Sequence, residues 1–210
     1  MLRRHKKKGL LVHPVTFKNC ADGLKTKSQC AADSVFSCGY RSFAILKNGM
    51  VFGWGLNNYG QLGVGDYENR FRPELVEGVP QCVQIDGGIH HTIALSADGT
   101  CYGFGRGDSG QLALAQGPMK GITLPVAIPS LASVAGPVAS IGCGTNHNLA
   151  ITRGGKLFVW GFGEMQQLGN GECRDEHFPI EVPIAGGPGV ALLQVSGGGQ
   201  HSALLARGAK

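Results

Sequence analysis

CGYRSFAILKNGMVFGWGLNNYGQLG, residues 38–63, decides the fold of this 210-residue chain because the chain repeats it. Two apolar runs, residues 43–46 and 50–54, flank the pair Asn48-Gly49. Asn-Gly between apolar runs is the strongest short-range signal for a hairpin, because both residues tolerate the positive φ of a two-residue turn. The stretch therefore predicts two antiparallel strands followed by a Gly-rich loop.

Three later segments are similar to the beginning of this stretch, and they start at Gly87, Cys143 and Gly197, roughly 50–56 residues apart. Each of the first three units continues into a glycine turn, an apolar strand that closes on an aromatic-glycine pair, and a Gln-Leu loop. Helical repeats are excluded, because glycine occurs every few positions and apolar residues alternate with a period of two. The recurring residues are Trp54, Phe104, Trp160, Gly55, Gly105, Gly161, Gln61, Gln111 and Gln167, with a proline opening the last strand of each unit at Pro73, Pro125 and Pro179 and at Pro14 before the first unit.

Units of this length with about four short strands are typical of β-propeller blades, which stand radially around a channel in rings of ~4–8. We therefore predict an all-β fold with about three to four blades, in which the recurring aromatic packs between neighbouring blades. So few blades leave strand edges unpaired, and we expect closure by a missing propeller half or by self-association. The predicted division is a basic loop or tail at 1–9 and propeller repeats at 10–210, namely the end of a preceding blade at 10–34, repeat units at 35–83, 84–139 and 140–193, and the first strand of an incomplete last blade at 194–210.

The net charge of +5 is concentrated at the N-terminal end, where residues 1–27 carry eight basic side chains and one acidic side chain. The run consists of Arg3, Arg4, Lys6, Lys7 and Lys8. Such a run is either a solvated tail or a patch for nuclear import or nucleic-acid contact. The sequence is compatible with both alternatives.

The seven cysteines are scattered and include no Cys-x-x-Cys pair. This argues against a disulfide framework or a zinc knuckle and suggests a reducing compartment. Cys38 and Cys143 occupy matching repeat positions, where Gly87 and Gly197 stand in the other units, so we expect small buried residues there. No apolar run approaches the ~20 residues of a membrane helix, and no membrane partner is expected.

The repeats resemble those of the regulator of chromosome condensation family, the guanine-nucleotide exchange factors of the small GTPase Ran. FGWGLNNY at 52–59, GGIHHT at 87–92 and VSGGGQHSALL at 195–205 are similar, in this order, to the C-terminal half of the family's propeller. The resemblance implies a partial seven-bladed propeller in a nuclear, chromatin-associated protein. Its implied partners are a Ran-like GTPase and, as a further partner, chromatin or DNA. Cytoplasm and mitochondrion are alternative locations, because relatives with these repeats occur there.

The resemblance also implies that His91 and His201 contact the GTPase, and that the family's acidic contacts and its β-wedge lie outside this sequence. From the residues alone, His91, His147 and His201 occupy one repeat slot, with Ser42 in the remaining unit, and this recurrence favours a structural role. His90 and His91 are not expected to chelate a metal together, because successive side chains of a strand point to opposite faces.

The sequence is compatible with two functions. One is nucleotide exchange, and the other is a protein-interaction scaffold without exchange activity. Neither requires a nucleophile, a general base or a metal, and the scattered carboxylates show no paired spacing for acid–base chemistry. We therefore expect no enzyme activity and no cofactor.

Overall fold

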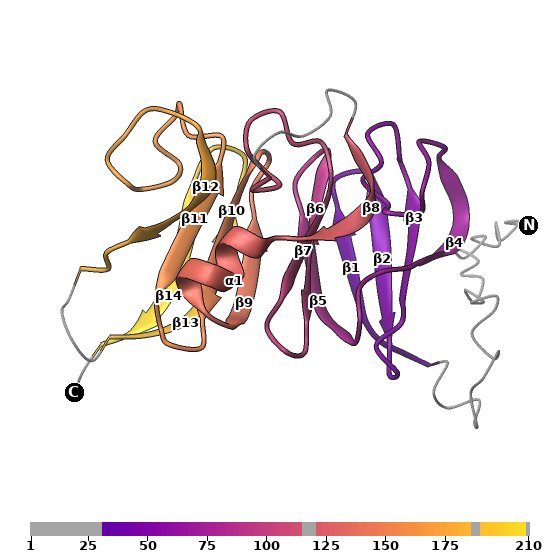
Figure 1. Ribbon diagram of the computed structural model, residues 1–210, viewed down its shortest axis with the longest axis horizontal. Coiled ribbons are helices and arrows are strands. Elements are labelled where there is room, and N and C mark those ends of the chain that lie inside the picture. The colour runs from indigo at the N-terminus through magenta and orange to yellow at the C-terminus, as the bar shows by residue number, and fades with distance from the viewer. Residues whose placement is uncertain (1–30, 115–120, 186–189, 209–210) are drawn as a thin grey trace, which may run out of the picture.

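The computed structural model describes residues 31–114, 121–185 and 190–208 of the chain. The basic run at residues 3–8 and the strand expected around Pro14 lie outside these described residues. Within them, the chain forms four antiparallel sheets and one short helix (Figure 1). The all-β prediction is confirmed.

Each sheet is one blade, and the strands follow one another across it in chain order. Blade 1 contains β1 (Ala32–Cys38), β2 (Arg41–Leu46), β3 (Val51–Gly55) and β4 (Arg70–Val76). Blade 2 contains β5 (Cys82–Gly87), β6 (His91–Ser96), β7 (Cys101–Gly105) and β8 (Ile122–Ala127), and blade 3 contains β9 (Val138–Cys143), β10 (His147–Thr152), β11 (Leu157–Gly161) and β12 (Glu176–Val182). In the described part of the chain, blade 4 contains β13 (Ala191–Gly197) and β14 (Ser202–Arg207).

Two features differ from the sequence prediction. Blade 4 has two described strands rather than one, because Gly197 ends β13 instead of preceding the first strand of the blade. A short helix, α1 (Pro129–Ala135), connects β8 to β9. Proline at its first position suits a helix start, because that N–H has no intrahelical partner in any case.

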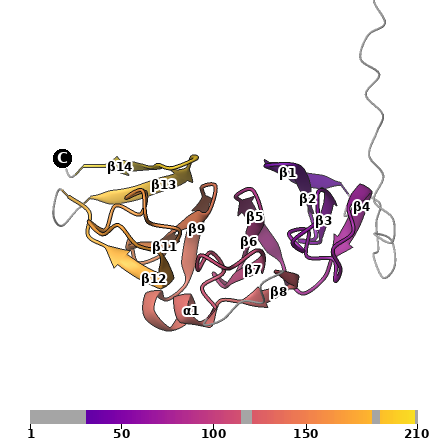
Figure 2. The ribbon, with the colours of Figure 1, turned by 90° about the horizontal axis from the view of Figure 1, so that it is seen from above.

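The four blades stand side by side along an arc, which gives a partial propeller (Figure 2). Strands β1, β5, β9 and β13 line the concave side, and β4, β8 and β12 lie on the convex side together with α1. The loops that join β1 to β2 and β3 to β4, with their counterparts in blades 2 to 4, open at one end of the blades. We call this end the loop face, and the opposite end, with the β2–β3 turn and its counterparts, the turn face.

A hairpin turn forms between β2 and β3 at the predicted place, but its loop contains Lys47, Asn48 and Gly49, and Gly49 has a positive φ whereas Asn48 does not. The Gly49 N–H donates to the Leu46 carbonyl at 2.8 Å, and Gly49 has a φ of 81°. A Cβ atom there would lie 2.7 Å from Gln81 Cα of the next blade. Glycine is therefore required both by the turn and by the close approach of blade 2.

The hydrophobic core lies between neighbouring blades. Ile45 of blade 1 packs in one cluster with Ile85 of blade 2, and Ile151 of blade 3 packs in another with Val195 of blade 4. Phe104 meets Phe43 of the preceding blade edge to face, with ring centroids 6.3 Å apart. The blades are thus held to each other by apolar burial as well as by the chain.

Candidate functional site

Two histidines of the repeat slot lie inside the joints between blades. His91 is fully buried, and its Nε2 lies 2.7 Å from Asn148 Oδ1 of the next blade. His147 is also buried, and its Nε2 lies 2.9 Å from Ser202 Oγ of the blade after that. Burial lowers the pKa of His91 to about 3 and that of His147 to about 4. Both rings are therefore neutral at pH 7.

The fourth member of the slot is Arg41, so the prediction that Ser42 occupies it is wrong. Arg41 lies opposite Gly55 in the β2–β3 register, as His91 lies opposite Gly105 and His147 opposite Gly161. The loop before β2 has two residues and the loop before β6 has three, which shifts the sequence alignment by one position.

Arg41 makes the same contact to the next blade as the histidines. Its Nε and Nη2 donate to Thr92 Oγ1 at 3.1 and 2.9 Å, and its Nη1 donates to the Gly88 and Ile89 carbonyls. Burial lowers the pKa of Arg41 to about 10, so its guanidinium remains charged at neutral pH. The charge is met by hydroxyl and carbonyl oxygens, as a buried cation requires.

A second hydrogen bond completes each joint. The residue to which the slot side chain is hydrogen-bonded also donates a hydrogen bond to the main-chain carbonyl of the recurring glutamine in the preceding blade. Thr92 Oγ1 donates to the Gln61 carbonyl at 2.8 Å, and Asn148 Nδ2 donates to the Gln111 carbonyl at 2.8 Å. Ser202 Oγ donates to the Gln167 carbonyl at 2.7 Å. We call the slot residue, its acceptor and this carbonyl the joint network.

The recurring glutamines also hold their own loops. The side-chain oxygen of Gln61 accepts from the Tyr59 N–H at 2.8 Å, and the side-chain oxygen of Gln111 accepts from the Ser109 N–H at 2.9 Å. Gln167 does the same with the Met165 N–H at 3.0 Å. The loop face is thus fixed to the blades at three equivalent places.

Buried thiols and a half-buried carboxyl lie beside the first two joints. Burial raises the pKa of Cys38 to about 11 and that of Cys143 further above its ordinary value. Asp86 accepts from the Cys143 N–H at 2.9 Å and from the Gly87 N–H at 2.8 Å. Burial raises the pKa of Asp86, and this increase is partly offset by those two hydrogen bonds and by the nearby Arg41, which lower the pKa. These thiols are protonated at neutral pH and poor nucleophiles.

Three side chains form a cluster on the loop face across the boundary of blades 1 and 2. The rings of Tyr59 and His90 have centroids 4.5 Å apart, and Arg106 Cζ lies 5.6 Å from the centroid of Tyr59. Arg106 also forms an ion pair with Asp108 at 2.5 Å. Desolvation, with smaller contributions from Arg106 and Arg41, lowers the pKa of His90. The cluster presents a neutral imidazole beside a paired guanidinium.

The two histidines to which the family resemblance gives GTPase contact, His91 and His201, have different surroundings. His201 is exposed on the loop that joins β13 to β14, whereas His91 is enclosed in the joint. His90, the neighbour of His91, is half-buried at the surface of the loop face. The structure therefore does not bring His91 and His201 onto a common accessible surface.

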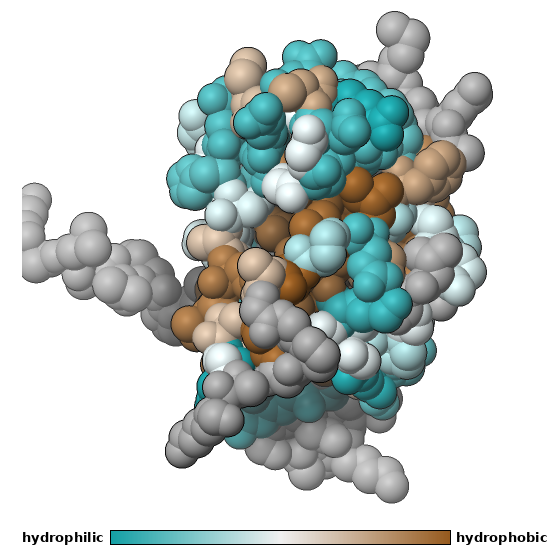
Figure 3. All heavy atoms as spheres, turned by 90° about the vertical axis from the view of Figure 1, so that its left-hand side faces the viewer, coloured by the Kyte–Doolittle hydropathy of each residue, from teal (hydrophilic) through white to brown (hydrophobic). Residues whose placement is uncertain are grey.

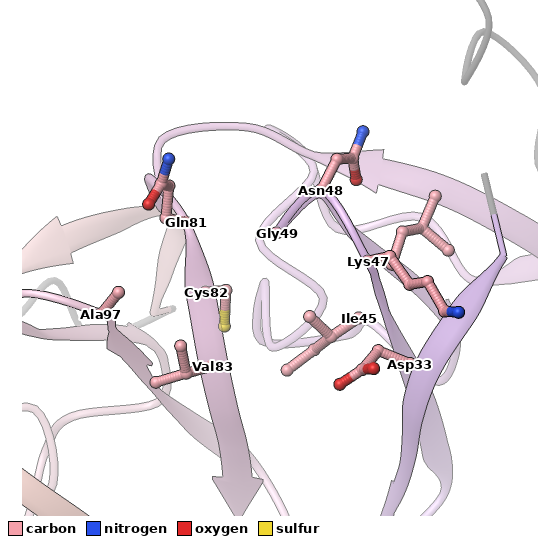
Figure 4. A pocket seen from close by; sticks show the side chains of 10 residues that line it. Asp33, Ile45, Lys47, Asn48, Gly49, Gln81, Cys82, Val83 and Ala97 are labelled. Carbon is pink, nitrogen blue, oxygen red and sulfur yellow. The ribbon is translucent and has the colours of Figure 1, made fainter. Parts of the chain in front are cut away.

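A cavity of about 560 Å³ lies at the turn face between blades 1 and 2 (Figure 4). Asp33, Lys47, Gln81 and Cys82 are among its lining residues. Burial raises the pKa of Cys82 to about 12, so this thiol is not a nucleophile at neutral pH. Across the described residues, no group of three or more His, Cys, Asp and Glu side chains is placed to hold a metal ion, and no helix is long and apolar enough to cross a membrane.

Sequence comparison gives matches over most of the chain. A protein-family model described as RCC1-like domain matches residues 4–204. The human regulator of chromosome condensation is 37% identical over 175 residues, which cover 81% of this chain and 40% of that protein. The ultraviolet-B receptor UVR8 of Arabidopsis thaliana is 35% identical over 149 residues, which cover 70% of this chain and 33% of that protein.

Structure comparison agrees with these matches. Prp20p from Saccharomyces cerevisiae superimposes with a TM-score of 0.76 at 25% identity, over 85% of this chain and 44% of that one. That structure was reported together with the binding of Prp20p to Gsp1p and histones. The chain thus spans less than half the length of these relatives.

Proposed function

The chain belongs to the RCC1-like domain family, as its repeats predicted, and on that premise we propose that its loop face contacts a Ran-like small GTPase as part of a guanine-nucleotide exchange factor. Exchange breaks no covalent bond. The factor binds the nucleotide-free GTPase in preference to the loaded form, and by linkage it weakens nucleotide binding by the same factor. Such a mechanism requires a rigid surface rather than a nucleophile.

The observation that carries the proposal is the joint network below the loop face. It repeats at three successive joints, through Arg41, His91 and His147, and each time it ties a glutamine loop to the following blade. A loop face held in this way is ordered before binding, so less conformational entropy is lost when a partner docks. The binding of Gsp1p by Prp20p supports the choice of a GTPase as partner.

We propose His90 and His201 as contact residues. His201 is exposed, and the ring of His90 is held against Tyr59 at the surface of the loop face. His91 would reach a partner only if the joint to Asn148 opened, since its ring is fully buried. His90 therefore replaces His91 in this proposal.

A release assay tests the exchange activity. Ran loaded with fluorescent GDP is mixed with a protein that carries this chain in a completed propeller, and the rate of GDP release is measured. We expect acceleration over the intrinsic rate and a loss of acceleration in His90→Ala and His201→Ala. His177→Ala, an exposed histidine on β12 at the convex side, is the matched control and retains full activity. Release at the intrinsic rate would reject the proposal.

The second candidate is an interaction scaffold without exchange activity. UVR8 favours it, because a relative 35% identical to this chain is named as a receptor and not as an exchange factor. A scaffold would bind its partner without regard to a bound nucleotide. Equal affinity for GDP-loaded and nucleotide-free Ran would therefore support the scaffold.

The basic run is proposed as a chromatin contact in a nuclear protein. Support comes from the histone binding of Prp20p and from the charge of Arg3, Arg4, Lys6, Lys7 and Lys8. Replacing Lys6, Lys7 and Lys8 by alanine should weaken DNA binding and flatten its salt dependence, because fewer counterions are released. An unchanged salt slope would show that these lysines contact no phosphate.

A further inference from the structure

The cavity of about 560 Å³ on the turn face lies at the end of the blades opposite the loop face (Figure 4). Its volume is within the range of ligand pockets, roughly 300–1,000 Å³. Asp33 of β1 and Val83 of β5 line it, together with Ile45 of β2 and Ala97 of the turn after β6. Both walls of the cavity are therefore described blades, unlike the hydrophobic surface in Figure 3, which borders the last described strand.

In the following joint, the chain places an arginine at the position that corresponds to this cavity. Lys47, Ala97 and Arg153 hold one position in blades 1, 2 and 3, because the N–H of each donates to the carbonyl of the residue just before the first strand of its own blade. Arg153 reaches back across the joint between blades 2 and 3, and its Nη2 donates to the Ala97 carbonyl at 2.7 Å. In the joint between blades 1 and 2, the corresponding side chain is the methyl group of Ala97 and the corresponding carbonyl is that of Lys47. Since a methyl group donates no hydrogen bond, the Lys47 carbonyl does not receive the guanidinium that its counterpart receives.

The cavity also carries a carboxylate that suits a guanidinium. Asp33 is exposed, and in Figure 4 its carboxylate points into the space between β1 and β5, toward Cys82, whereas the Lys47 ammonium points the other way. The counterparts of Asp33 in the registers of blades 2 and 3 are Val83 and Ala139, so among these three blades the charge is particular to the first joint. A carboxylate and a main-chain carbonyl in one cavity match the several N–H donors of a guanidinium.

The backbone at the rim of the cavity differs from that of the next joint as well. Gln81 has a φ of 42°, which is uncommon for a residue other than glycine. Pro137 holds the corresponding position in blade 3, and proline cannot adopt a positive φ. Residues held in such conformations cluster at sites that bind ligands. The rim is therefore a local structure of its own and not a copy of the next joint.

We propose that this cavity binds an arginine side chain of a partner protein. The guanidinium takes the place that Arg153 has in the following joint, and it donates to the Lys47 carbonyl and to the Asp33 carboxylate. The aliphatic part of the arginine packs on Ile45 and Val83, which line the cavity. Lysine fits less well, because an ammonium lacks the planar fork that donates to two acceptors at once.

This inference goes beyond the proposed function, which concerns the loop face. The arginine site lies on the turn face, and its residues include neither His90 nor His201. Its test measures the binding of a peptide rather than the release of GDP. The two proposals therefore fail separately.

The experiment titrates the full 210-residue chain with the capped peptide Ala-Ala-Arg-Ala-Ala and follows the NMR shifts of the backbone amides. We expect saturable shifts at Lys47, Gly49 and Ala97, with a dissociation constant of about 1 mM or lower. The same peptide with lysine in place of arginine should bind at least about threefold more weakly. A third peptide carries glutamate at this place and should bind more weakly still. Equal or tighter binding of the glutamate peptide would show that Lys47 and not Asp33 attracts the ligand, and would overturn the proposal.

Two variants make the test specific for the proposed geometry. Ala97→Arg supplies the guanidinium from the chain itself, as Arg153 does in the next joint, and should weaken the arginine peptide at least about tenfold. Asp33→Asn should raise the dissociation constant about three- to tenfold, because a charge-assisted hydrogen bond becomes a neutral one.

Glu77→Gln is the matched control, since it removes an exposed carboxylate between β4 and β5 that does not line the cavity, and it should bind as the wild type does. Asp33, Ala97 and Glu77 are all exposed, so the variants leave the fold intact. The absence of saturable shifts, equal effects of Asp33→Asn and Glu77→Gln, or undiminished binding to Ala97→Arg would overturn the proposal.

Discussion

The buried histidine of the second joint should make the stability of the protein depend on pH. Burial lowers the pKa of His91 from 6.5 to about 3 in the folded chain. The unfolded chain therefore takes up this proton first as the pH falls. Stability that is fully present above pH 6.5 is then lost progressively as the pH falls toward 3.

The size of the effect follows from the width of this window. Each pH unit inside it costs about 1.4 kcal/mol of unfolding free energy. Between pH 7 and pH 5, the unfolded histidine becomes almost fully protonated while the folded one stays neutral. His91 alone should then lower the unfolding free energy by about 2 kcal/mol.

The pH dependence of the unfolding free energy is compared between the wild type and the variant His91→Gln. Glutamine keeps an amide N–H within reach of Asn148 Oδ1 but does not titrate. His147 acts in the same direction, since its pKa is lowered too, and the raised pKa of Asp86 acts in the opposite direction at lower pH. Both groups are present in both proteins, so they cancel in the difference.

Urea denaturation at fixed protein concentration measures the unfolding free energy at each pH. The loss of unfolding free energy from pH 7 to pH 5 should be about 2 kcal/mol greater in the wild type than in His91→Gln. Equal losses in the two proteins would show that His91 is not held neutral in the joint. The structural role that we assign to the slot would then be refuted.

Three further predictions concern the joints, the turn and the thiols. Asn148→Ala should lower the unfolding free energy by about 1–3 kcal/mol, because the hydrogen bonds to His91 and to the Gln111 carbonyl are both lost. Asn146→Ala, at a half-buried position, is the control. Equal losses of unfolding free energy in the two variants would count against the joint network. Gly49→Ala should lower the free energy of unfolding by at least about 1 kcal/mol because of the positive φ alone, and the close contact to Gln81 adds to this loss. In Gly154→Ala the new Cβ has no neighbour closer than 3.7 Å, so this control variant should be nearly neutral when both are measured by thermal unfolding. Exposed Cys173 should react with iodoacetamide at pH 8, and mass spectrometry should show Cys82, Cys101 and Cys143 unmodified. The reason is that these three thiols are buried and burial raises their pKa. Fast modification of Cys101 would contradict its burial.

The repeats and the turn could be predicted because they depend on local residues. Asn48-Gly49 specifies a hairpin wherever it occurs between apolar runs. The spacing of Trp54, Phe104 and Trp160 reveals the repeat before any contact is known. The blade architecture follows, since four short strands cannot bury their apolar residues alone.

The contents of the joints could not be predicted in the same way. Whether a histidine is buried depends on the next blade, which lies more than fifty residues away in the sequence, as in the bond of His91 to Asn148. The slot was misassigned because the loop before Arg41 is one residue shorter than the loop before His91. Alignment on Gly55, Gly105 and Gly161, which lie opposite the slot, would have identified Arg41.

The helix and the second strand of blade 4 were missed for different reasons. Residues 129–135 form one short helix whose two turns show too little periodicity to be recognised. The sequence repeat begins at Gly197, but Gly197 is the last residue of β13, so the sequence division places the strand from Ala191 in the preceding unit. Repeat boundaries drawn from sequence need not coincide with the ends of strands.

The affinity of the chain for Ran with and without nucleotide tests the central claim most directly. Dissociation constants are measured for nucleotide-free Ran and for Ran saturated with GDP, using the chain in a completed propeller. The proposal predicts binding at least about tenfold tighter to the nucleotide-free form, because exchange requires the two ligands to weaken each other. Equal dissociation constants for the two forms would contradict it.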